Sequence, residues 1–120
     1  MSNYKELVEK INATFTEGDT EGFLGYCSDN LKWTMVGEKT IEGKDAVRSF
    51  MGQMEGMTPP NFTVDAVVSD DQYAVAHGDM TMQDQEGTTG EYRYCDFYRF
   101  ENDKVVELTS YVIKTNRGEN

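Results

Sequence analysis

Basic side chains are scarce in this sequence of 120 residues. It has 11 Lys and Arg against 22 Asp and Glu, which gives a formal net charge of −11 and a pI near 4.4. Residues 1–60 carry 6 basic and 10 acidic side chains (a net charge of −4), and residues 61–120 carry 5 and 12 (−7). Phosphate backbones and anionic lipid surfaces need clustered Lys and Arg, so we expect neither nucleic acid nor a membrane as a partner.

Cysteine and histidine are also scarce. The sequence has Cys27, Cys95 and one histidine, His77, too few for a disulfide framework or a usual Cys/His zinc site. We therefore expect no zinc site of this kind, and the functions considered below imply no metal and no organic cofactor. The sequence shows no setting that would lower the pKa of either thiol, so we expect both cysteines to be small buried hydrophobes.

Long apolar runs are missing too. No stretch approaches the roughly 20 apolar residues that a membrane-spanning helix needs, and the first twenty residues carry six charged side chains, unlike a signal peptide. We expect a cytoplasmic protein. The content of 38% hydrophobic and 12% aromatic residues is typical of a folded chain, and the length predicts one domain over residues 1–120.

The N-terminal half has the periodicity of helices. One helix face is predicted from the i, i+3, i+4, i+7, i+11 spacing of Tyr4, Leu7, Val8, Ile11 and Phe15. Asn3 with Glu6 suits the N-terminal cap of this helix, and Gly18 suits its end. Asp19 can cap a second, short helix that ends near Tyr26 or Cys27.

A β-like stretch over residues 31–36 follows, and Gly37 with Lys39–Glu42 predicts a short hairpin. A third helix is predicted from Gly43 or Lys44, with one apolar side made of Ala46, Val47, Phe50, Met51 and Met54. The stretch MTPP at residues 57–60 is expected to end the helical half.

The C-terminal half is typical of strands. Four β-like runs cover residues 62–69, 73–83, 92–101 and 105–114, and the turn-forming stretches SDDQ, DQEGTTG and END separate them. Short connections predict an antiparallel meander. Helices followed by a sheet indicate an α+β domain.

One carboxylate stands out in the third of these runs, YRYCDFYRF at residues 92–100. Side chains alternate between the two faces of a strand. Asp96 therefore shares the apolar face with Tyr92, Tyr94, Tyr98 and Phe100. A carboxylate buried without partners is costly, so it either stays protonated or finds donors. We expect either an acid with a raised pKa that serves a function, or a structural Asp held by hydroxyls, water or an Arg.

Four motifs together resemble the nuclear transport factor 2-like superfamily, which includes the SnoaL-like and ketosteroid isomerase-like cone folds. They are FTEGDTEGFLGYCSDN (15–30), LKWTMVGEKTIEGKDAVRSF (31–50), CDFYRFENDKVVEL (95–108) and SYV (110–112). In the third motif Asp103 replaces the usual Gly. The resemblance implies three helices on a strongly curved, mostly antiparallel sheet of the cystatin-like type, which forms a cone with an internal pocket. It also implies a homodimer formed through the outer sheet face.

The resemblance gives Asp96 a role. In ketosteroid isomerase the aspartate of the D-x-x-R-F motif points into the cone and helps to bind the developing oxyanion; Asp96 occupies that place. The general base of that enzyme would fall on Met35, and its oxyanion tyrosine on Ile11. Limonene epoxide hydrolases would need Arg at Tyr94 and Asp near Ile113, and scytalone dehydratase-like sites need two histidines. None of these three constellations is therefore expected.

The family register also predicts which other side chains line the pocket. The candidates share an apolar or aromatic character and an inward position: Ile11, Phe15, Trp33, Met35, Phe50, Met80, Met82, Tyr94 and Tyr98. Each could equally be a core residue, although a Met-rich wall suits irregular apolar ligands. The same register turns His77, Arg93, Phe97 and Arg99 to the outside of the sheet.

Three functions are compatible with these residues. The first is an enzyme, an isomerase, cyclase or dehydratase, which acts on a small apolar carbonyl compound of polyketide or steroid type, with Asp96 as acid/base or hydrogen-bond donor. The second is a ligand-binding module without chemistry, because general acid/base work usually needs a second group. The third is a protein-interaction domain, which should expose an apolar patch.

Overall fold

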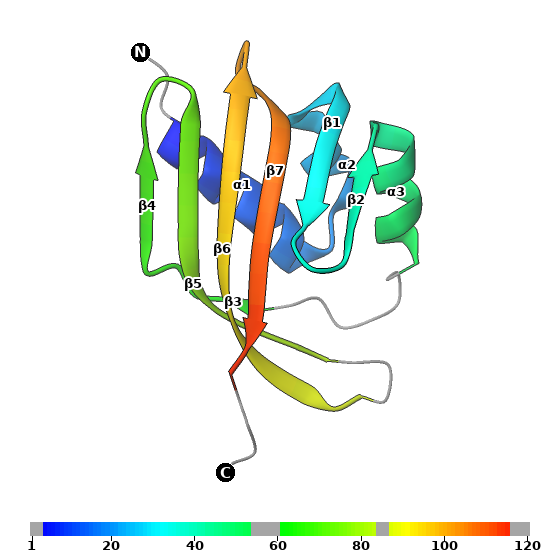
Figure 1. Cartoon of the computed structure of the whole chain (residues 1–120), viewed down its shortest axis with the longest axis vertical. Coiled ribbons are helices and arrows are strands. Elements are labelled where there is room, and N and C mark those ends of the chain that lie inside the picture. Colours follow the sequence, from blue (N-terminus) through cyan, green and yellow to red (C-terminus); the bar gives the residue numbers. More distant parts are fainter. Residues whose placement is uncertain (1–3, 54–60, 84–86, 116–120) are drawn as a thin grey trace.

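The computed structural model describes residues 4–53, 61–83 and 87–115. Within these ranges the elements follow the order α1-α2-β1-β2-α3-β3-β4-β5-β6-β7 (Figure 1), with all three helices in the N-terminal half, as predicted. None of the helices in the described ranges is both long enough and apolar enough to span a membrane.

Helix α1 spans Tyr4–Glu17 and buries the predicted stripe. Tyr4, Val8 and Ile11 are buried, and the stripe's other two members are half-buried against the same core. The chain leaves the helix at Gly18, whose φ of 68° is left-handed and costs Gly little. The predicted cap at Asn3 lies outside the described residues.

Helix α2 spans Thr20–Gly25 and starts where the sequence predicts. The Asp19 side chain caps it and accepts a hydrogen bond from the Gly22 N–H at 3.0 Å. Phe23 and Leu24 of this helix are buried in the core. This short helix contacts both α1 and β1.

Strand β1 spans Cys27–Met35 and pairs with β2, Lys39–Glu42, as the predicted hairpin. β1 begins four residues before its predicted start at Leu31, because Cys27 already pairs with Val105 of β7, a partner remote in sequence.

Helix α3 spans Lys44–Gly52 and buries Val47. The prediction that Ala46 lies on its apolar side is wrong: Ala46 is exposed, since it stands about 100° around the helix from Val47. Met54 and residues 57–60 lie outside the described part of the chain.

The C-terminal strands are β3 (Asn61–Phe62), β4 (Ala66–Ser69), β5 (Tyr73–Gln83), β6 (Thr89–Glu101) and β7 (Lys104–Lys114). In the described residues the sheet has the order β2-β1-β7-β6-β5-β3, and β4 also pairs with β5. The antiparallel meander of β4 to β7 confirms the prediction. β1 joins it in parallel to β7.

The single strand predicted over residues 62–69 is divided by a bulge into β3 and β4. Phe62 pairs with Met80 and Ala66 with His77, so three residues on one side oppose two on the other. Gly78 lies opposite the bulge, where an added Cβ would stand 2.0 Å from the Thr63 carbonyl oxygen. A residue without a side chain is therefore required at this close backbone approach.

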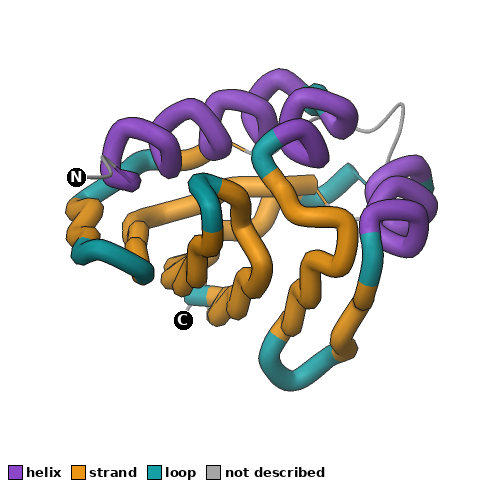
Figure 2. The backbone as a smooth tube through the Cα atoms, turned by 90° about the horizontal axis from the view of Figure 1, so that it is seen from above, coloured by secondary structure: helices purple, strands orange, loops and turns teal. Residues whose placement is uncertain are grey.

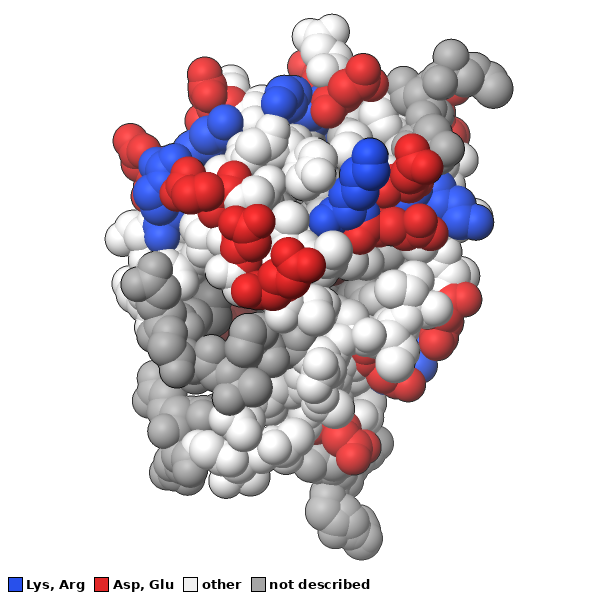
Figure 3. Space-filling view, turned by 180° about the vertical axis from the view of Figure 1, so that it is seen from behind, with Lys and Arg blue, Asp and Glu red and all other residues white. Residues whose placement is uncertain are grey.

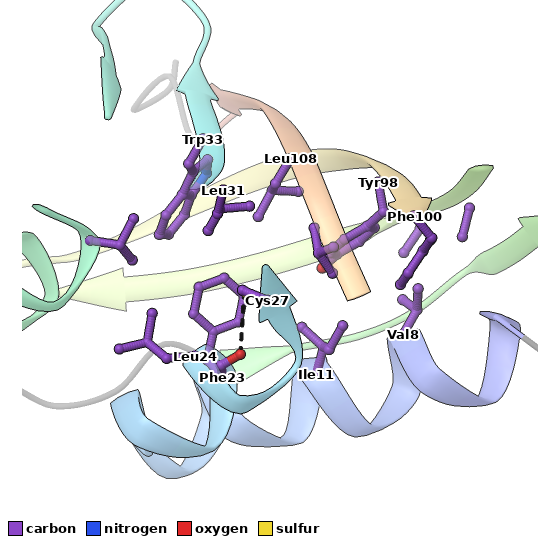
Figure 4. Packing of buried hydrophobic residues seen from close by; sticks show 14 of the residues in the cluster. Val8, Ile11, Phe23, Leu24, Cys27, Leu31, Trp33, Tyr98, Phe100 and Leu108 are labelled. Carbon is purple, nitrogen blue, oxygen red and sulfur yellow. Dashed lines mark hydrogen bonds between the residues drawn. The ribbon is translucent and has the colours of Figure 1, made fainter. Parts of the chain in front are cut away.

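The sheet is strongly bent, and the helices lie on its concave side (Figures 1 and 2). Helix α1 crosses the concave side of the bent sheet, and α3 lies beside the β1–β2 hairpin. The space between is filled by a core that includes Val8, Ile11, Phe23, Leu24, Cys27, Leu31, Trp33, Tyr98, Phe100 and Leu108 (Figure 4). This is the α+β cone that the sequence predicts.

On the side of the molecule opposite to the view of Figure 1, charged side chains of both signs gather over the upper part. Lys and Arg stand there beside Asp and Glu (Figure 3). One such group in the protein joins Arg48 to Glu21 at 2.7 Å and to Asp45 at 2.9 Å. Exposed pairs of this kind add little to stability.

Candidate functional site

Asp96 lies in the middle of β6 with its side chain on the inner face of the sheet. It is only 7% exposed. Its neighbours across the sheet are Ala76 on β5 and Ser110 on β7. Burial raises the pKa of Asp96 to about 6, and a hydrogen bond with the Ser110 side chain acts in the opposite direction. Asp96 is thus an acid that exchanges its proton close to neutral pH.

Ser110 connects Asp96 to Trp33. The indole Nε1–H of Trp33 donates to the Ser110 Oγ at 3.0 Å. All three side chains are buried. They come from β1, β7 and β6, which are adjacent strands in the sheet. The carboxyl group therefore belongs to a buried polar chain that crosses three strands.

Five aromatic side chains, which we call the aromatic wall, come from α1, α3 and three strands: Phe15, Phe50, Trp33, Phe62 and Tyr94. The Phe15 ring lies 6.1 Å from that of Trp33 and 6.2 Å from that of Phe62, measured between centroids. Trp33 meets Phe50 edge to face at 5.9 Å, and Phe62 meets Tyr94 in the same way at 5.3 Å. Contacts of this geometry are favourable for aromatic rings.

The predicted pocket residues fall into three groups by exposure. Ile11 and Tyr98 have no exposed surface and are packed in the core (Figure 4). Trp33, Met80 and Tyr94 are almost fully buried. The half-buried group, which presents apolar surface outside the core, is Phe15, Met35, Phe50 and Met82.

The two tyrosine hydroxyls nearest to Asp96 along β6 differ. The Tyr94 hydroxyl donates to the Thr63 carbonyl at the bulge, at 2.9 Å. The Tyr98 hydroxyl is buried and has no hydrogen-bond partner among the described residues. Burial, with a contribution from Asp96, raises the pKa of Tyr94 to about 12 and that of Tyr98 well above its ordinary value. Both phenols are therefore neutral where Asp96 titrates.

The sequence model of the SnoaL-like domain family matches residues 8–108 of this chain. The chain belongs to the SnoaL-like domain family. The match includes Trp33 and Asp96 and ends just before Ser110. A search of curated proteins found no match to the chain.

Solved structures share the fold of this SnoaL-like domain. A nuclear transport factor 2-like protein of unknown function from Cytophaga hutchinsonii is 31% identical, with 88% of this chain and 95% of that chain covered and a TM-score of 0.71. Another such protein, from Burkholderia pseudomallei, is 20% identical over 92% and 90% of the chains, with a TM-score of 0.83. TerC, co-crystallised with polyporic acid, is 15% identical over 91% and 90%, with a TM-score of 0.79.

Sequence reasoning missed three residues of this interior. Ser110 was not singled out, although it binds Asp96 and Trp33. Phe62 was treated only as part of a strand, yet it joins α1 to Tyr94. Asn12 is buried, and within the described part of the chain neither of its side-chain polar atoms has a hydrogen-bond partner. A signal for Asn12 was available, because it lies one residue after Ile11 and four after Val8, at the edge of the apolar stripe.

The outer face of the sheet holds the residues that the register turns outward. Arg93 bridges Asp65 at 3.0 Å and Asp79 at 2.7 Å, and its Nη2 lies 3.5 Å from the His77 Nδ1.

Cys27 is buried, as predicted, and burial raises its pKa to about 12. The same prediction for Cys95 is wrong: it is half-buried, because it lies on this open face opposite Asp96.

A groove of about 520 Å³ lies between α1 and α2, lined by Lys10, Glu17, Asp19 and Tyr26 among others. It is open to solvent and includes none of the predicted pocket residues. The internal pocket therefore stays a prediction that rests on the side chains around Asp96.

Among residues 4–53, 61–83 and 87–115, no three His, Cys, Asp or Glu side chains are grouped so that they could hold a metal ion.

Proposed function

We propose that this SnoaL-like domain binds a small apolar or aromatic molecule with a carbonyl group in the interior of its cone. Asp96 would be its acid/base or hydrogen-bond donor. One observation carries the proposal: a carboxyl group 7% exposed, with a pKa raised to about 6 by burial. Strongly perturbed acids of this kind are frequent at functional sites.

The surroundings of Asp96 suit an apolar ligand. Opposite Tyr94 to Tyr98, the inner face of β5 carries small residues, Ala74, Ala76 and Gly78. Half-buried Met and Phe side chains, among them Phe15, Met35 and Phe62, pack against the same core. A protonated carboxyl in such a setting can donate to a carbonyl oxygen and stabilise the negative charge that develops on it. Isomerisation, cyclisation or dehydration of a polyketide- or steroid-like compound needs this type of help.

The comparison with TerC supports the choice of ligand class, since that protein was crystallised with polyporic acid. We therefore choose polyporic acid and a set of enolisable aryl ketones as first probes. Trp33 is the single tryptophan of the chain and packs in the aromatic wall, so its fluorescence should report binding.

The test compares Asp96→Asn with the wild type. We expect the amide to weaken probe binding about tenfold and to remove any turnover, because it cannot supply an acidic proton. Asp79→Asn on the outer face is the matched control and should behave as the wild type. Equal affinity and equal turnover in the wild type and Asp96→Asn would refute the proposal.

Binding without chemistry is the second candidate. It is favoured by the fact that Asp96 has Ser110 as its hydrogen-bond partner, and a serine hydroxyl bound to an indole is not a second acid or base. Mass spectrometry after long incubation separates the two candidates. Under this alternative Asp96→Asn changes affinity while no product forms from any bound probe.

The outer face of the sheet supports a homodimer as partner. Phe97 and Tyr111 are 40% and 46% exposed there, and Ile113 is 67% exposed. Ion pairs of Arg93 and Arg99 with nearby acids lie on the same face. An apolar centre with charged groups around it is typical of interfaces. Sedimentation should give a dimer. Phe97→Lys should dissociate it, and Val36→Lys, in the turn after β1, should not. A wild-type monomer at high concentration would overturn this assignment.

A further inference from the structure

The direction of the hydrogen bond between Trp33 and Ser110 follows from the chemistry of the two groups. An indole nitrogen carries a hydrogen and has no lone pair to offer, so it can only donate. At 3.0 Å from the Trp33 Nε1, the Ser110 Oγ must be the acceptor. Trp33 and Ser110 are 8% and 7% exposed, so exchange of this bond for water is disfavoured.

The direction of the next bond follows from the first. A serine hydroxyl has one hydrogen and two lone pairs, and Trp33 occupies one lone pair. Asp96 stands directly across from Ser110 in the β6–β7 pairing, and their side chains are hydrogen-bonded. If Asp96 donated to Ser110, the serine hydrogen would be left without this acceptor in a buried place, which is costly. The arrangement that satisfies both groups has Ser110 donating to Asp96.

We propose that Trp33 and Ser110 are positioning residues that hold one carboxyl oxygen of Asp96 as an acceptor, so that the proton of the acid form sits on the other oxygen. The chain of donors runs one way, from indole to hydroxyl to carboxyl. The oxygen that carries the proton is the one left free for a ligand.

This inference deepens the proposed function and rests on it for the identity of the ligand group. An acid that presents a hydrogen selects a ligand atom that can accept it, such as a carbonyl oxygen, over a group that can only donate. Trp33 then contributes an apolar ring surface to the interior and no donor to the ligand, because its N–H is already used. The side-chain amide of Asn12, which has no partner in residues 4–53, 61–83 and 87–115, is not part of this series of hydrogen bonds.

The neighbouring groups leave Asp96 as the titrating centre of this region. On its own strand Tyr94 and Tyr98 are neutral below pH 9, since burial raises the pKa of both. From β1, Cys27 has its pKa raised to about 12. From β5 and β7, the residues facing Asp96 are Ala76 and Ser110. Cys95, on the opposite face, is neutral as well, because burial and Asp96 raise its pKa.

The single indole N–H, that of Trp33, gives one resonance in a ¹H–¹⁵N spectrum. This resonance tests the series of hydrogen bonds from Trp33 through Ser110 to Asp96 in the unliganded protein. We expect it to shift with pH with the same midpoint as the Asp96 carboxyl. The shift should vanish in Asp96→Asn and in Ser110→Ala, and return in Ser110→Thr, which keeps the hydroxyl. Thr109→Val on the other face of β7 is the matched control and should leave the midpoint unchanged.

A double-mutant cycle on the Asp96 titration separates positioning from packing. Ser110→Ala should raise the pKa of Asp96 by about one unit, a tenfold change in its acid constant, since a charged acceptor loses a donor. Trp33→Phe should raise it less, and should add nothing when Ser110 is already Ala. An effect of Trp33→Phe that persists in the Ser110→Ala background, or an indole resonance that ignores pH, overturns the proposal.

These outcomes are independent of the test of function. The titrations use no ligand, so evidence against the Trp33–Ser110–Asp96 hydrogen bonds would leave the proposal of ligand binding by Asp96 unaffected. Conversely, if no probe bound, the proposed function would be refuted, while the indole resonance of Trp33 could still shift with the titration of the Asp96 carboxyl.

Discussion

Asp96 is held between two opposing effects. Removal from water favours the neutral acid, and the Ser110 hydroxyl favours the carboxylate. Burial is the larger effect, and the single hydrogen bond from Ser110 opposes it only in part. The result is a carboxyl group that is neither a firmly ion-paired structural Asp nor a permanently protonated one.

The two tyrosine hydroxyls of β6 offer a matched test of this interior. Tyr98→Phe removes a buried hydroxyl that has no partner in the part of the chain that the structure describes, so we expect the free energy of unfolding to stay equal or to rise by about 1 kcal/mol. Tyr94→Phe removes a hydrogen bond to the bulge carbonyl and should cost about 1 kcal/mol. Urea denaturation of both variants measures the difference, and a loss in Tyr98→Phe as large as in Tyr94→Phe would contradict the assignment.

At this scale strand alternation correctly placed Asp96 among buried aromatic residues. Alternation could not predict that Ser110 of β7 lies opposite Asp96. Counting from the two-residue turn at Asn102 and Asp103 would place Thr109 opposite Asp96. The ladder shifts register between Arg99 and Phe100, and this shift brings Ser110 there instead. A bulge set by tertiary packing has no local signal in the sequence.

Among the elements, the bulge between β3 and β4 has the clearest sequence requirement. Gly78→Ala would place a Cβ 2.0 Å from the Thr63 oxygen, so we expect a loss of about 2–3 kcal/mol in the free energy of unfolding. Gly52→Ala at the end of α3 meets no atom within 4 Å and should be neutral or stabilising by about 0.5–1 kcal/mol. Thermal denaturation of the pair checks this; a Gly78→Ala variant as stable as the wild type would mean that the two backbones are not in contact.

Element types and their order could be predicted from periodicity and turn residues, since α1, α2, the hairpin and the meander all have local signals. What failed depends on partners remote in sequence. β1 starts early because it pairs with β7, and the predicted 62–69 strand divides where it bends across β5. Asn12 was missed because burial of a polar group contradicts the pattern on which helix faces are predicted.

For the whole molecule, the raised pKa of Asp96 predicts how stability depends on pH. The folded protein binds this proton more tightly than the unfolded chain, whose Asp pKa is about 3.9. The stabilisation is complete below about pH 4 and is lost as pH rises through about 6. The difference of about two pKa units amounts to about 3 kcal/mol.

Asp96→Asn should therefore gain stability relative to the wild type as pH rises from 4 to 8, by up to about 3 kcal/mol. Urea midpoints at several pH values measure this. Asp70→Asn is the control with the opposite sign, because backbone N–H groups of Gln72 and Tyr73 lower the pKa of the exposed Asp70. A constant difference between Asp96→Asn and the wild type over this range would contradict the account.

The most direct test of the central claim is the titration of the Asp96 side-chain carboxyl by carbon-detected NMR, with Asp96→Asn to assign the resonance. We predict a midpoint near 6, about two units above that of an ordinary Asp. That result would mean an acid held in an apolar interior and able to donate near neutral pH. A midpoint at or below about 3.9 would mean a solvated or ion-paired carboxylate, and it would contradict the account of Asp96 as the functional acid of the cone.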